Sequence, residues 1–456
     1  MQSSYNSIDT IVAIATPSGT GGVGVVRVSG RDLTRFCVGI LGSEIASRKA
    51  TYTHFRAADG ECLDMGIALY FPGPASFTGE SVLELQGHGG IVVLDRLVQR
   101  CIQLGARHAR PGEFTERAFL HGKIDLTQAE AVADLIESSS VQAARSALRS
   151  MQGDFAQVVN TIIKKLIDTR VYVEAAIDFP EEEVDFLAEP VLIQWLDELA
   201  RSIDQVTADA RQGVLLRDGL SVVLAGKPNV GKSSLLNRLL GEERAIVTDE
   251  AGTTRDVLKH RIVFEGVPIQ FIDTAGLRDT DSAIEREGIR RAWLEIDTAD
   301  HILLIADASE ASRPHLNEAW PEYFMQYPEK THRVSQVFNK IDCSDDAPGL
   351  QRDGSTVCVS AKYSLGIQEL LSFLVAQAGY IERGEGIFSA RRRHLLALAD
   401  ARGYVQAGRA QLDRYGSGEL LAEDLRMAQK KLEEIGGAVT SDDLLGHIFS
   451  SFCIGK

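Results

Sequence analysis

The first 120 residues carry short apolar runs separated by clusters of turn-forming residues. Ile11–Ala15 and Val23–Ser29 are rich in β-branched side chains, and a Pro-Ser-Gly-Thr-Gly-Gly cluster at 17–22 lies between them. Runs of this kind, bounded by Gly and Pro, are typical of β-strands joined by turns. The pattern predicts a β-rich N-terminal domain over residues 1–120.

Near residue 121 the spacing of apolar positions changes to three and four. Thr127 and Glu130 form a capping-box pattern, in which the hydroxyl and the carboxylate each bond a backbone amide of the first helical turn. Apolar residues then recur at helical spacing, at Val159, Ile162, Ile163, Leu166 and Ile167. We therefore expect helices over residues 121–217, interrupted near Phe179 and Pro180.

From residue 218 to residue 380, apolar strand-like runs alternate with helical patterns. This alternation is typical of a doubly wound α/β sheet. After residue 381 the chain reads as helical again to residue 456, so the α/β unit is inserted into a helical domain. The expected strands are Ser221–Ala225, Ile269–Asp273, His301–Asp307, Arg333–Phe338 and Thr356–Val359.

Composition adds few constraints to this picture. A length of 456 residues suggests about three domains. The net charge of −16 argues against a surface that coats nucleic acid generally, and the densest basic cluster, Arg391–His394, fits a local RNA contact or a solvated helix start equally well. The six cysteines form no Cys-x-x-Cys pair, and there is no signal-peptide core and no 18-residue apolar run. These features predict a cytoplasmic protein without a membrane span.

Residues 226–233 fit the phosphate-binding pattern G-x-x-x-x-G-K-[ST]. The pattern follows an apolar strand and opens a helical run, which is the context it requires. Backbone amides at the helix N-terminus would face the phosphates, Lys232 would reach the β- and γ-phosphate oxygens, and the Ser233 hydroxyl suits magnesium. A Gly-rich strand-to-helix turn without a ligand is the alternative. The GTP contacts expected here are Asn229, Val230, Gly231, Lys232, Ser233 and Ser234.

Two further segments have the character of γ-phosphate sensors. Asp273 ends an apolar strand and is followed by Thr274, Ala275 and Gly276; its carboxylate can hold magnesium through water, and the Gly276 amide can approach the γ-phosphate. Between the two motifs lies a Gly-Thr-Thr segment, in which Thr254 would reach magnesium and Thr253 a neighbouring oxygen.

Asn339, Lys340, Ile341 and Asp342 form a guanine-reading pattern after another apolar strand. The Asp342 carboxylate offers two acceptors to the adjacent donors on the guanine edge, and adenine would leave that carboxylate unpaired. Ser360, Ala361 and Lys362 follow the next strand and fit the loop that contacts the guanine oxygen. Four motifs in one order predict a GTP-binding domain.

Two local features modify this reading. Gly19, Gly21 and Gly24 match a dinucleotide fingerprint, but that fingerprint needs a following helix and Val23–Ser29 reads as a strand. Leu277 stands where many GTPases carry a Gln that orients the attacking water. Hydrolysis must therefore be organised differently here, or be very slow.

The two ends of the chain closely resemble the MnmE-type (TrmE) family of tRNA-modification GTPases, and the resemblance extends over essentially the whole chain. It is carried by Asp9–Ala13 with Gly21–Gly24, Phe77–Glu80, Leu85–Gly90, Ala109–Phe114, Ala129–Ala131 and the tail Phe452–Lys456. It implies an α+β tetrahydrofolate-binding-like domain, a helical domain and an inserted Ras-like G domain. The implied divisions are 1–120, 121–217, 218–380 and 381–456.

The resemblance also implies partners and a second ligand. It implies a homodimer held by the N-terminal domains and an FAD-dependent partner of the MnmG (GidA) type. With that partner, such proteins install an aminomethyl or carboxymethylaminomethyl group at the wobble uridine of tRNAs, with a tetrahydrofolate derivative as the one-carbon source. Cys453 is either a chemical participant or a packed tail thiol. The positions that match the family's folate contacts are Arg27, Glu84, Lys123 and Lys456.

A potassium ion takes the place of an arginine finger in this family, which would answer the problem that Leu277 poses. A fixed monovalent cation can neutralise the charge that develops in the transition state. Glu285 matches the acidic residue that helps position the attacking water, and it is otherwise an ordinary solvated carboxylate. Glu250 departs from the apolar residue usual at its position, which matters little if only its carbonyl binds. The matching potassium ligands are Asn229, Thr248, Glu250 and Thr253.

Two other classes of GTPase remain to be weighed. A ribosome-assembly or regulatory switch GTPase would share the G domain without modification activity, but no convincing KH-type Gly-x-x-Gly loop follows residue 380. A membrane-remodelling GTPase would need a span or a basic amphipathic helix. The N- and C-terminal signatures favour the tRNA-modification GTPase.

Overall fold

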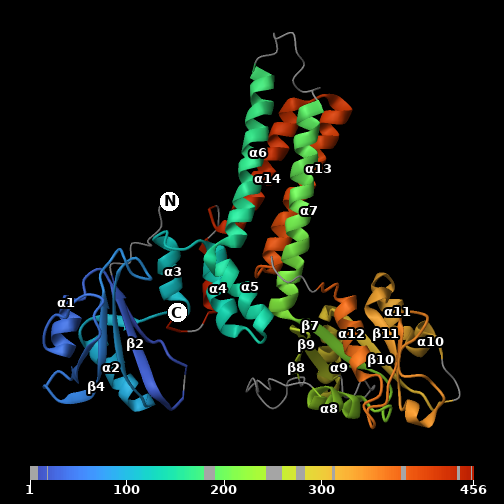
Figure 1. The fold of residues 1–456 in the computed structure, drawn as a ribbon, viewed down its shortest axis with the longest axis horizontal. Coiled ribbons are helices and arrows are strands. Elements are labelled where there is room, and N and C mark those ends of the chain that lie inside the picture. The colour runs from blue at the N-terminus through green and yellow to red at the C-terminus, as the bar shows by residue number, and fades with distance from the viewer. Residues whose placement is uncertain are drawn as a thin grey trace. The chain divides into compact units, whose positions relative to one another are not determined.

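A computed structural model describes the greater part of the chain (Figure 1). Packing divides the chain into two compact units, which are described separately: Met1–Ala133 with Val159–Ile167 and Arg426–Lys456, and Asp134–Val158 with Asp168–Leu425. The described residues are 9–17, 19–178, 190–242, 259–273, 283–310, 314–381, 387–438, 442–452 and 454–455.

The first unit is built around a six-stranded sheet with the order β3-β4-β5-β2-β1-β6. All neighbours pair antiparallel except β1 and β6, which are parallel. The strands predicted near Ile11 and Val23 are confirmed as β1 and β2, so the Gly19-Gly21-Gly24 pattern leads into a strand and not into a helix. The strands are β1 (Thr10–Ile14), β2 (Gly21–Gly30), β3 (Thr51–Arg56), β4 (Cys62–Phe71), β5 (Ser81–Gly89) and β6 (Ala106–His108).

Helices cover this sheet and bring the C-terminal segment to it. Helix α2 (Ile91–Gln103) buries Leu94, Leu97 and Val98 in the same core as β2 and β5. Helix α15 (Asp442–Ser450) packs near α3 (Glu113–Leu120), where a Cβ on Gly112 would lie 2.6 Å from the Phe449 carbonyl oxygen. Gly112 has φ +66°, so both its conformation and its close neighbour require glycine. The remaining short helices are α1 (Thr34–Phe36) and the π-helical turn Cys37–Leu41.

The predicted helical regions are confirmed on both sides of the α/β unit. One detail differs, because the residue that caps α4 is Asp125 and not Thr127. Asp125 Oδ1 accepts from the Gln128 amide at 2.9 Å and Gln128 Oε1 accepts from the Asp125 amide at 3.0 Å, while Thr127 and Glu130 are buried inside the helix. No described helix is both long and apolar enough to cross a membrane. The helices are α4 (Leu126–Glu137), α5 (Val141–Gln152), α6 (Asp154–Asp178), α7 (Pro190–Asp218), α13 (Arg392–Tyr415) and α14 (Gly418–Gly436).

The second unit contains a seven-stranded sheet with the order β12-β13-β11-β10-β7-β9-β8. The five central strands are parallel and the two edge strands, β8 and β12, are antiparallel, which confirms the doubly wound α/β prediction. Strand β7 lies between β9 and β10, at the point where the winding reverses and open α/β sheets bind ligands. The strands are β7 (Leu220–Ala225), β8 (Lys259–Phe264), β9 (Val267–Asp273), β10 (His301–Asp307), β11 (Val334–Asn339), β12 (Gly349–Leu350) and β13 (Thr356–Cys358). The helices are α8 (Lys232–Glu242), α9 (Ala283–Thr298), α10 (Leu316–Ala319), α11 (Pro321–Gln326) and α12 (Ile367–Gln377).

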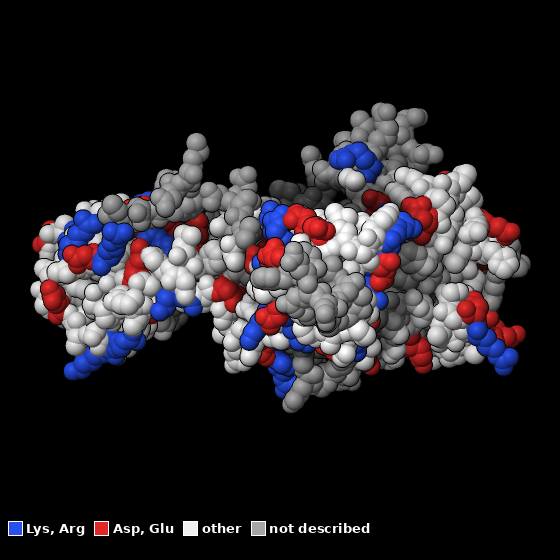
Figure 2. All heavy atoms as spheres, turned by 90° about the horizontal axis from the view of Figure 1, so that it is seen from above, with Lys and Arg blue, Asp and Glu red and all other residues white. Residues whose placement is uncertain are grey.

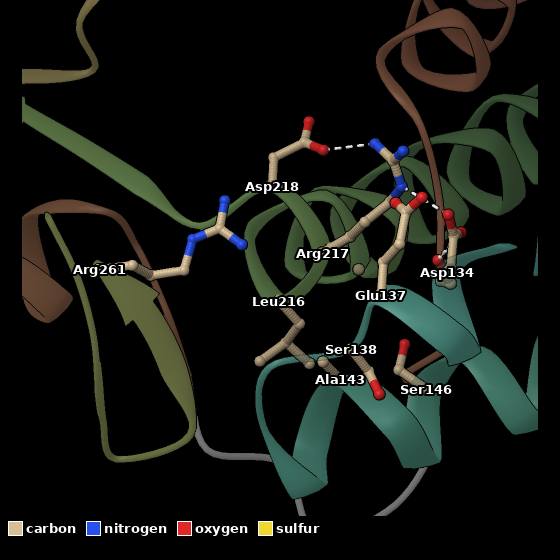
Figure 3. Close-up of a pocket in the computed structure, with 11 residues that line it drawn as sticks. Asp134, Glu137, Ser138, Ala143, Ser146, Leu216, Arg217, Asp218 and Arg261 are labelled. Atoms are coloured by element: carbon tan, nitrogen blue, oxygen red, sulfur yellow. Dashed lines mark hydrogen bonds and ion pairs between the residues drawn. The ribbon is translucent and has the colours of Figure 1, made fainter. Parts of the chain in front are cut away.

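One buried carboxylate, that of Asp134, joins the two chain connections of this sheet domain to the helices of the second unit, and Figure 3 shows its contact with Arg217. Asp134 Oδ1 accepts from Arg217 at 2.7 Å, where α7 ends, and from Arg391 at 2.9 Å, where α13 begins. Its Oδ2 accepts from the Ser389 hydroxyl at 2.6 Å. Arg391, the first residue of the basic cluster Arg391–His394, forms this ion pair. Its side chain therefore has a structural role and is not free to contact RNA.

Candidate functional site

The phosphate loop leaves β7 and enters α8 through backbone conformations that its sequence favours. Gly226 has φ +142°, and a Cβ there would lie 2.3 Å from the Ile305 carbonyl oxygen. Asn229 has φ +67°, a left-handed conformation that Asn tolerates better than most residues. Lys232 donates to the carbonyl oxygens of Gly226 at 2.9 Å and Lys227 at 3.0 Å. Both acceptors belong to the phosphate loop, so the ammonium group of Lys232 lies against the loop.

Asp273 lies at the end of β9, close enough to Lys232 for the two charges to interact. Burial raises the pKa of Asp273 and lowers that of Lys232, while each opposite charge counteracts part of the shift. Oδ1 of Asp273 is buried without a hydrogen-bond partner among the described residues. An orphaned carboxylate oxygen beside the phosphate loop fits magnesium held directly or through water. The exposed Ser233 hydroxyl opens α8 on the same loop.

The guanine-reading residues meet at the ends of β11 and β13. Asn339 is buried, donates to the Val230 carbonyl at 3.0 Å and accepts from the Ala361 amide at 3.1 Å. Asp342 Oδ1 accepts from the Ser360 hydroxyl at 2.6 Å, and this hydrogen bond lowers the pKa of Asp342. The motif residues therefore form one connected structure around a cavity of about 700 Å³, which Lys340 and Lys362 also line.

Two residues of this site carried no signal in the sequence. Arg238 on α8 donates to the carbonyl oxygens of Ala361 at 2.9 Å and Lys362 at 3.1 Å, which fixes the guanine loop. Asp307, at the end of β10, pairs with Lys340 at 2.6 Å. Neither belongs to a motif, and each acts on a partner more than 30 positions away in the chain.

Part of the predicted site lies outside the described residues. Glu285 lies on α9, but its side chain is not among those described. Nine other predicted site residues lie outside the described residues, and their roles stay predictions. These residues are Thr248, Glu250, Thr253, Thr254, Thr274, Ala275, Gly276, Cys453 and Lys456.

In the first unit, the structure joins two of the residues matched to folate contacts. Arg27 on β2 and Glu84 on β5 are register partners, and Arg27 donates to Glu84 Oε1 at 3.0 Å. The Gly455 carbonyl lies 3.5 Å from Arg27, so the chain tail reaches the same place. Lys123 is directed elsewhere, to the Pro74 carbonyl at 3.1 Å.

The surface charge agrees with the composition. On the face seen in Figure 2, Lys and Arg side chains of the described residues are interspersed with Asp and Glu and do not form one basic surface.

Comparisons with known proteins give the family. A family model described as "GTP-binding protein TrmE N-terminus" matches residues 10–123, and one described as "MnmE helical domain" matches residues 126–453. The tRNA modification GTPase MnmE of Pseudomonas paraeruginosa is 55% identical over 451 residues, covering 98% of this chain and 99% of that protein. The MnmE of Pseudomonas entomophila is 56% identical over 454 residues, with the same coverage. Among solved structures, the G domain of the T. maritima FeoB iron transporter is 27% identical and covers 35% of this chain and 98% of its own, with a TM-score of 0.27.

A family model that spans most of the chain and relatives of more than half identity over nearly its full length agree with the motifs at both ends. The chain belongs to the MnmE (TrmE) family of tRNA-modification GTPases.

Proposed function

We propose that this chain is a magnesium-dependent, potassium-activated GTP hydrolase that acts in modification of the wobble uridine of tRNA. The observation that supports the nucleotide assignment best is the convergence of Lys232, Asp273 and Asp342 beyond the carboxyl ends of strands in one parallel sheet. Loops at that edge are where such sheets bind ligands.

Different residues of the site bind the guanine, the phosphates and magnesium. Asp342 accepts from the two donors of the guanine edge, and the amides of residues 229–234 face the triphosphate at the N-terminus of α8. Lys232 exchanges its two loop carbonyls for the β- and γ-phosphate oxygens. Ser233, Thr254 and Asp273 would hold magnesium, which when bound neutralises phosphate charge. Thr274, Ala275 and Gly276 would then lie at the γ-phosphate.

Potassium would neutralise the negative charge that develops in the transition state. It would act in a site where Leu277 replaces the Gln that orients the attacking water in many GTPases. Asn229 presents a neutral amide oxygen on an exposed turn of the phosphate loop, a donor chemistry that suits a monovalent cation. Thr248, Glu250 and Thr253 would complete its coordination, and Glu285 would position the attacking water. Charge stabilisation of this kind acts in the transition state, so it should affect turnover more than GTP affinity.

GTP turnover in potassium and in sodium at equal ionic strength tests this proposal. We expect faster turnover in potassium, and we expect Asn229→Ala to remove the difference and lower the rate by about 100-fold, as loss of a transition-state charge contact does. Glu285→Ala should lower turnover even in potassium. Asn317→Ala, at an exposed residue of α10 that does not line the nucleotide cavity, is the matched control. Equal rates of the intact protein in both salts would end the potassium mechanism.

The tRNA reaction requires more than this chain. We propose a homodimer, an FAD-dependent MnmG (GidA) partner and a tetrahydrofolate derivative that binds near Arg27, Glu84, Lys123 and Lys456. The position of Gly455 beside Arg27 supports a role for the tail, including Cys453, at that site.

Nucleoside mass spectrometry of tRNA incubated with this chain, the flavin partner, GTP and folate tests the modification. The expected result is an aminomethyl-type product at the wobble uridine that disappears without GTP. An unmodified wobble uridine, with GTP turnover intact, would instead favour a switch or ribosome-assembly GTPase.

A further inference from the structure

The side chain of Lys340 connects two parts of the nucleotide site that lie far apart in the sequence. Its ammonium group donates to the Asn229 carbonyl oxygen at 2.9 Å and to Asp307 Oδ2 at 2.6 Å. Lys340 itself has φ +69°, which turns it back from the end of β11 over the phosphate loop. The Lys340 ammonium group thus connects Asn229, the expected potassium ligand, to Asp307, which belongs to none of the sequence motifs.

Asp307 is held firmly in this arrangement. Its Oδ1 accepts from the Ser309 amide at 2.9 Å and from the Ser309 hydroxyl at 2.7 Å, while Oδ2 faces Lys340. Burial opposes the charged form, but the hydrogen bonds from Lys340 and Ser309 hold the pKa of Asp307 at about 2. The carboxylate is therefore charged at neutral pH, and its side chain is only 15% exposed.

The hydrogen bond from Lys340 acts on the residue of the phosphate loop that has a left-handed backbone conformation. Asn229 has positive φ, and its carbonyl direction is set by the hydrogen bond from Lys340. The next carbonyl, that of Val230, is held by Asn339 at 3.0 Å. Two adjacent peptide units are thus fixed by the Asn339–Lys340 pair, at the residue whose side chain is the expected potassium ligand.

The charge of Asp307 matters as well as its geometry. A monovalent cation at Asn229 would lie close to the Lys340 ammonium, which repels it. Asp307 pairs with that ammonium and offsets its charge, in a half-buried place where screening by water is weaker than at the surface.

We infer that Asp307 is a positioning residue for the potassium site: through Lys340 it fixes the turn at Asn229 and offsets the nearby positive charge. The inference rests on the proposed potassium activation. It adds a residue that neither the motifs nor the proposed ligand set contains.

Asp307→Asn tests the inference, because it keeps the shape and the Ser309 contacts but removes the charge. Glu329→Gln is the matched control, since Glu329 is an exposed carboxylate of the same sheet domain that does not line the cavities beside the phosphate loop. We would measure GTP turnover over a potassium titration, fluorescent GTP binding, and amide hydrogen exchange of residues 226–232 in nucleotide-free, potassium-free protein.

Asp307→Asn should raise the potassium concentration for half-maximal turnover by roughly tenfold, the size expected when one contact in a polar network is lost. Exchange of residues 226–232 should become faster, with GTP binding changed far less. Glu329→Gln should match the intact protein in all three measurements.

The outcomes separate the inference from the function on which it rests. If the intact protein does not prefer potassium, the potassium proposal itself fails. If it does prefer potassium and Asp307→Asn leaves both the half-maximal concentration and the loop exchange unchanged, the inference alone is overturned. A lower melting temperature with unchanged potassium dependence would also overturn it, because Asp307 would then be only structural.

Discussion

At the scale of single residues, the guanine contact proposed for Asp342 depends on how its two carboxylate oxygens are shared. Oδ1 already accepts from the Ser360 hydroxyl, but a carboxylate oxygen has two acceptor sites, so both oxygens can still receive guanine donors. The Ser360 contact orients the carboxylate before the nucleotide arrives.

Asp342→Asn should therefore weaken GTP binding about 10- to 100-fold, because an amide donor then faces a guanine donor. Xanthosine triphosphate, which offers an acceptor there, should bind better than it does to the intact protein. Fluorescent-nucleotide titrations would measure both, with Asp345→Asn on an exposed neighbouring carboxylate as the control. Unchanged GTP affinity would show that the motif is misassigned.

The residues that sequence could identify are those within short motifs. Lys232, Asn339 and Asp342 each belong to a pattern of a few neighbouring positions with a known chemical purpose. Asp307 and Arg238 act through contacts set by strand order and by the direction of α8, so no local pattern marks them.

At the scale of elements, Asp134 ties α4 to the end of α7 and the start of α13. Its side chain is 4% exposed, and it accepts from two guanidinium groups and a hydroxyl. Removing one partner of a buried ion pair costs more than the pair contributes, because the remaining charge stays buried.

Asp134→Ala should lower the free energy of unfolding by about 3 kcal/mol, because it leaves Arg217 and Arg391 without their shared acceptor. Denaturant unfolding followed by circular dichroism would measure it. The control is Asp154→Ala, which breaks an exposed pair with Arg149 and should cost less than about 1 kcal/mol. Equal effects of the two substitutions would contradict a special role for Asp134.

The buried His301 on β10 should make the stability of the protein depend on pH. Burial, aided by Arg333 and His332, lowers its pKa from 6.5 to about 4, and the ring contacts Ser335 and Phe373. Between these values the unfolded chain binds the proton and the folded chain does not, so stability falls as pH falls from 6.5 towards 4. The full difference corresponds to about 3 kcal/mol.

His301→Phe should remove this contribution, so its melting temperature should depend less on pH between 6.5 and 4 than that of the intact protein. Thermal unfolding at several pH values would test this. His315→Phe, at an exposed histidine, provides the comparison for the substitution itself. Parallel pH profiles for His301→Phe and the intact protein would contradict the assignment.

The elements themselves were largely predictable, because apolar spacing is a local property. Strands β1 and β2 of the first sheet, β7, β9, β10, β11 and β13 of the second, and the long helices follow from it, whereas the other strands and the capping residue of α4 do not. The sequence pattern predicted Thr127 as the cap, but the reciprocal hydrogen bonds between Asp125 and Gln128, and the burial of Thr127 and Glu130, show that the helix begins two residues earlier. The order of the strands depends on contacts across the whole domain, which spacing does not report.

At the scale of the whole molecule, the candidate sites lie in different compact units. The nucleotide site is built entirely from the second unit, and Arg27, Glu84 and Gly455 belong to the first. Physical reasoning from the sequence predicted the nucleotide site but not the proposed folate site, because Arg27 and Glu84 are ordinary charged residues 57 positions apart. Family resemblance singled them out, and the register of β2 and β5 makes them neighbours. The division into 1–120, 121–217, 218–380 and 381–456 stays a prediction.

This separation leads to a prediction about folate. Arg27→Ala should weaken binding of a tetrahydrofolate derivative by roughly 10-fold or more, because a charged hydrogen-bond donor is lost. The folate affinity of Arg27→Lys should lie between those of the intact protein and Arg27→Ala, since an ammonium group keeps the charge but not the bidentate geometry of a guanidinium group. Calorimetry would measure folate binding, and GTP turnover would report on the second unit, where no change is expected.

Arg96→Ala, which breaks an exposed pair with Glu61 in the first unit, is the control. Because Glu84 is only 16% exposed and keeps Gln86 as a partner, a modest loss of stability is expected, and the melting temperature of each variant must be compared. Full folate affinity in a folded Arg27→Ala protein would place the folate site elsewhere, whereas a parallel loss of GTP turnover would show that the two units do not act independently.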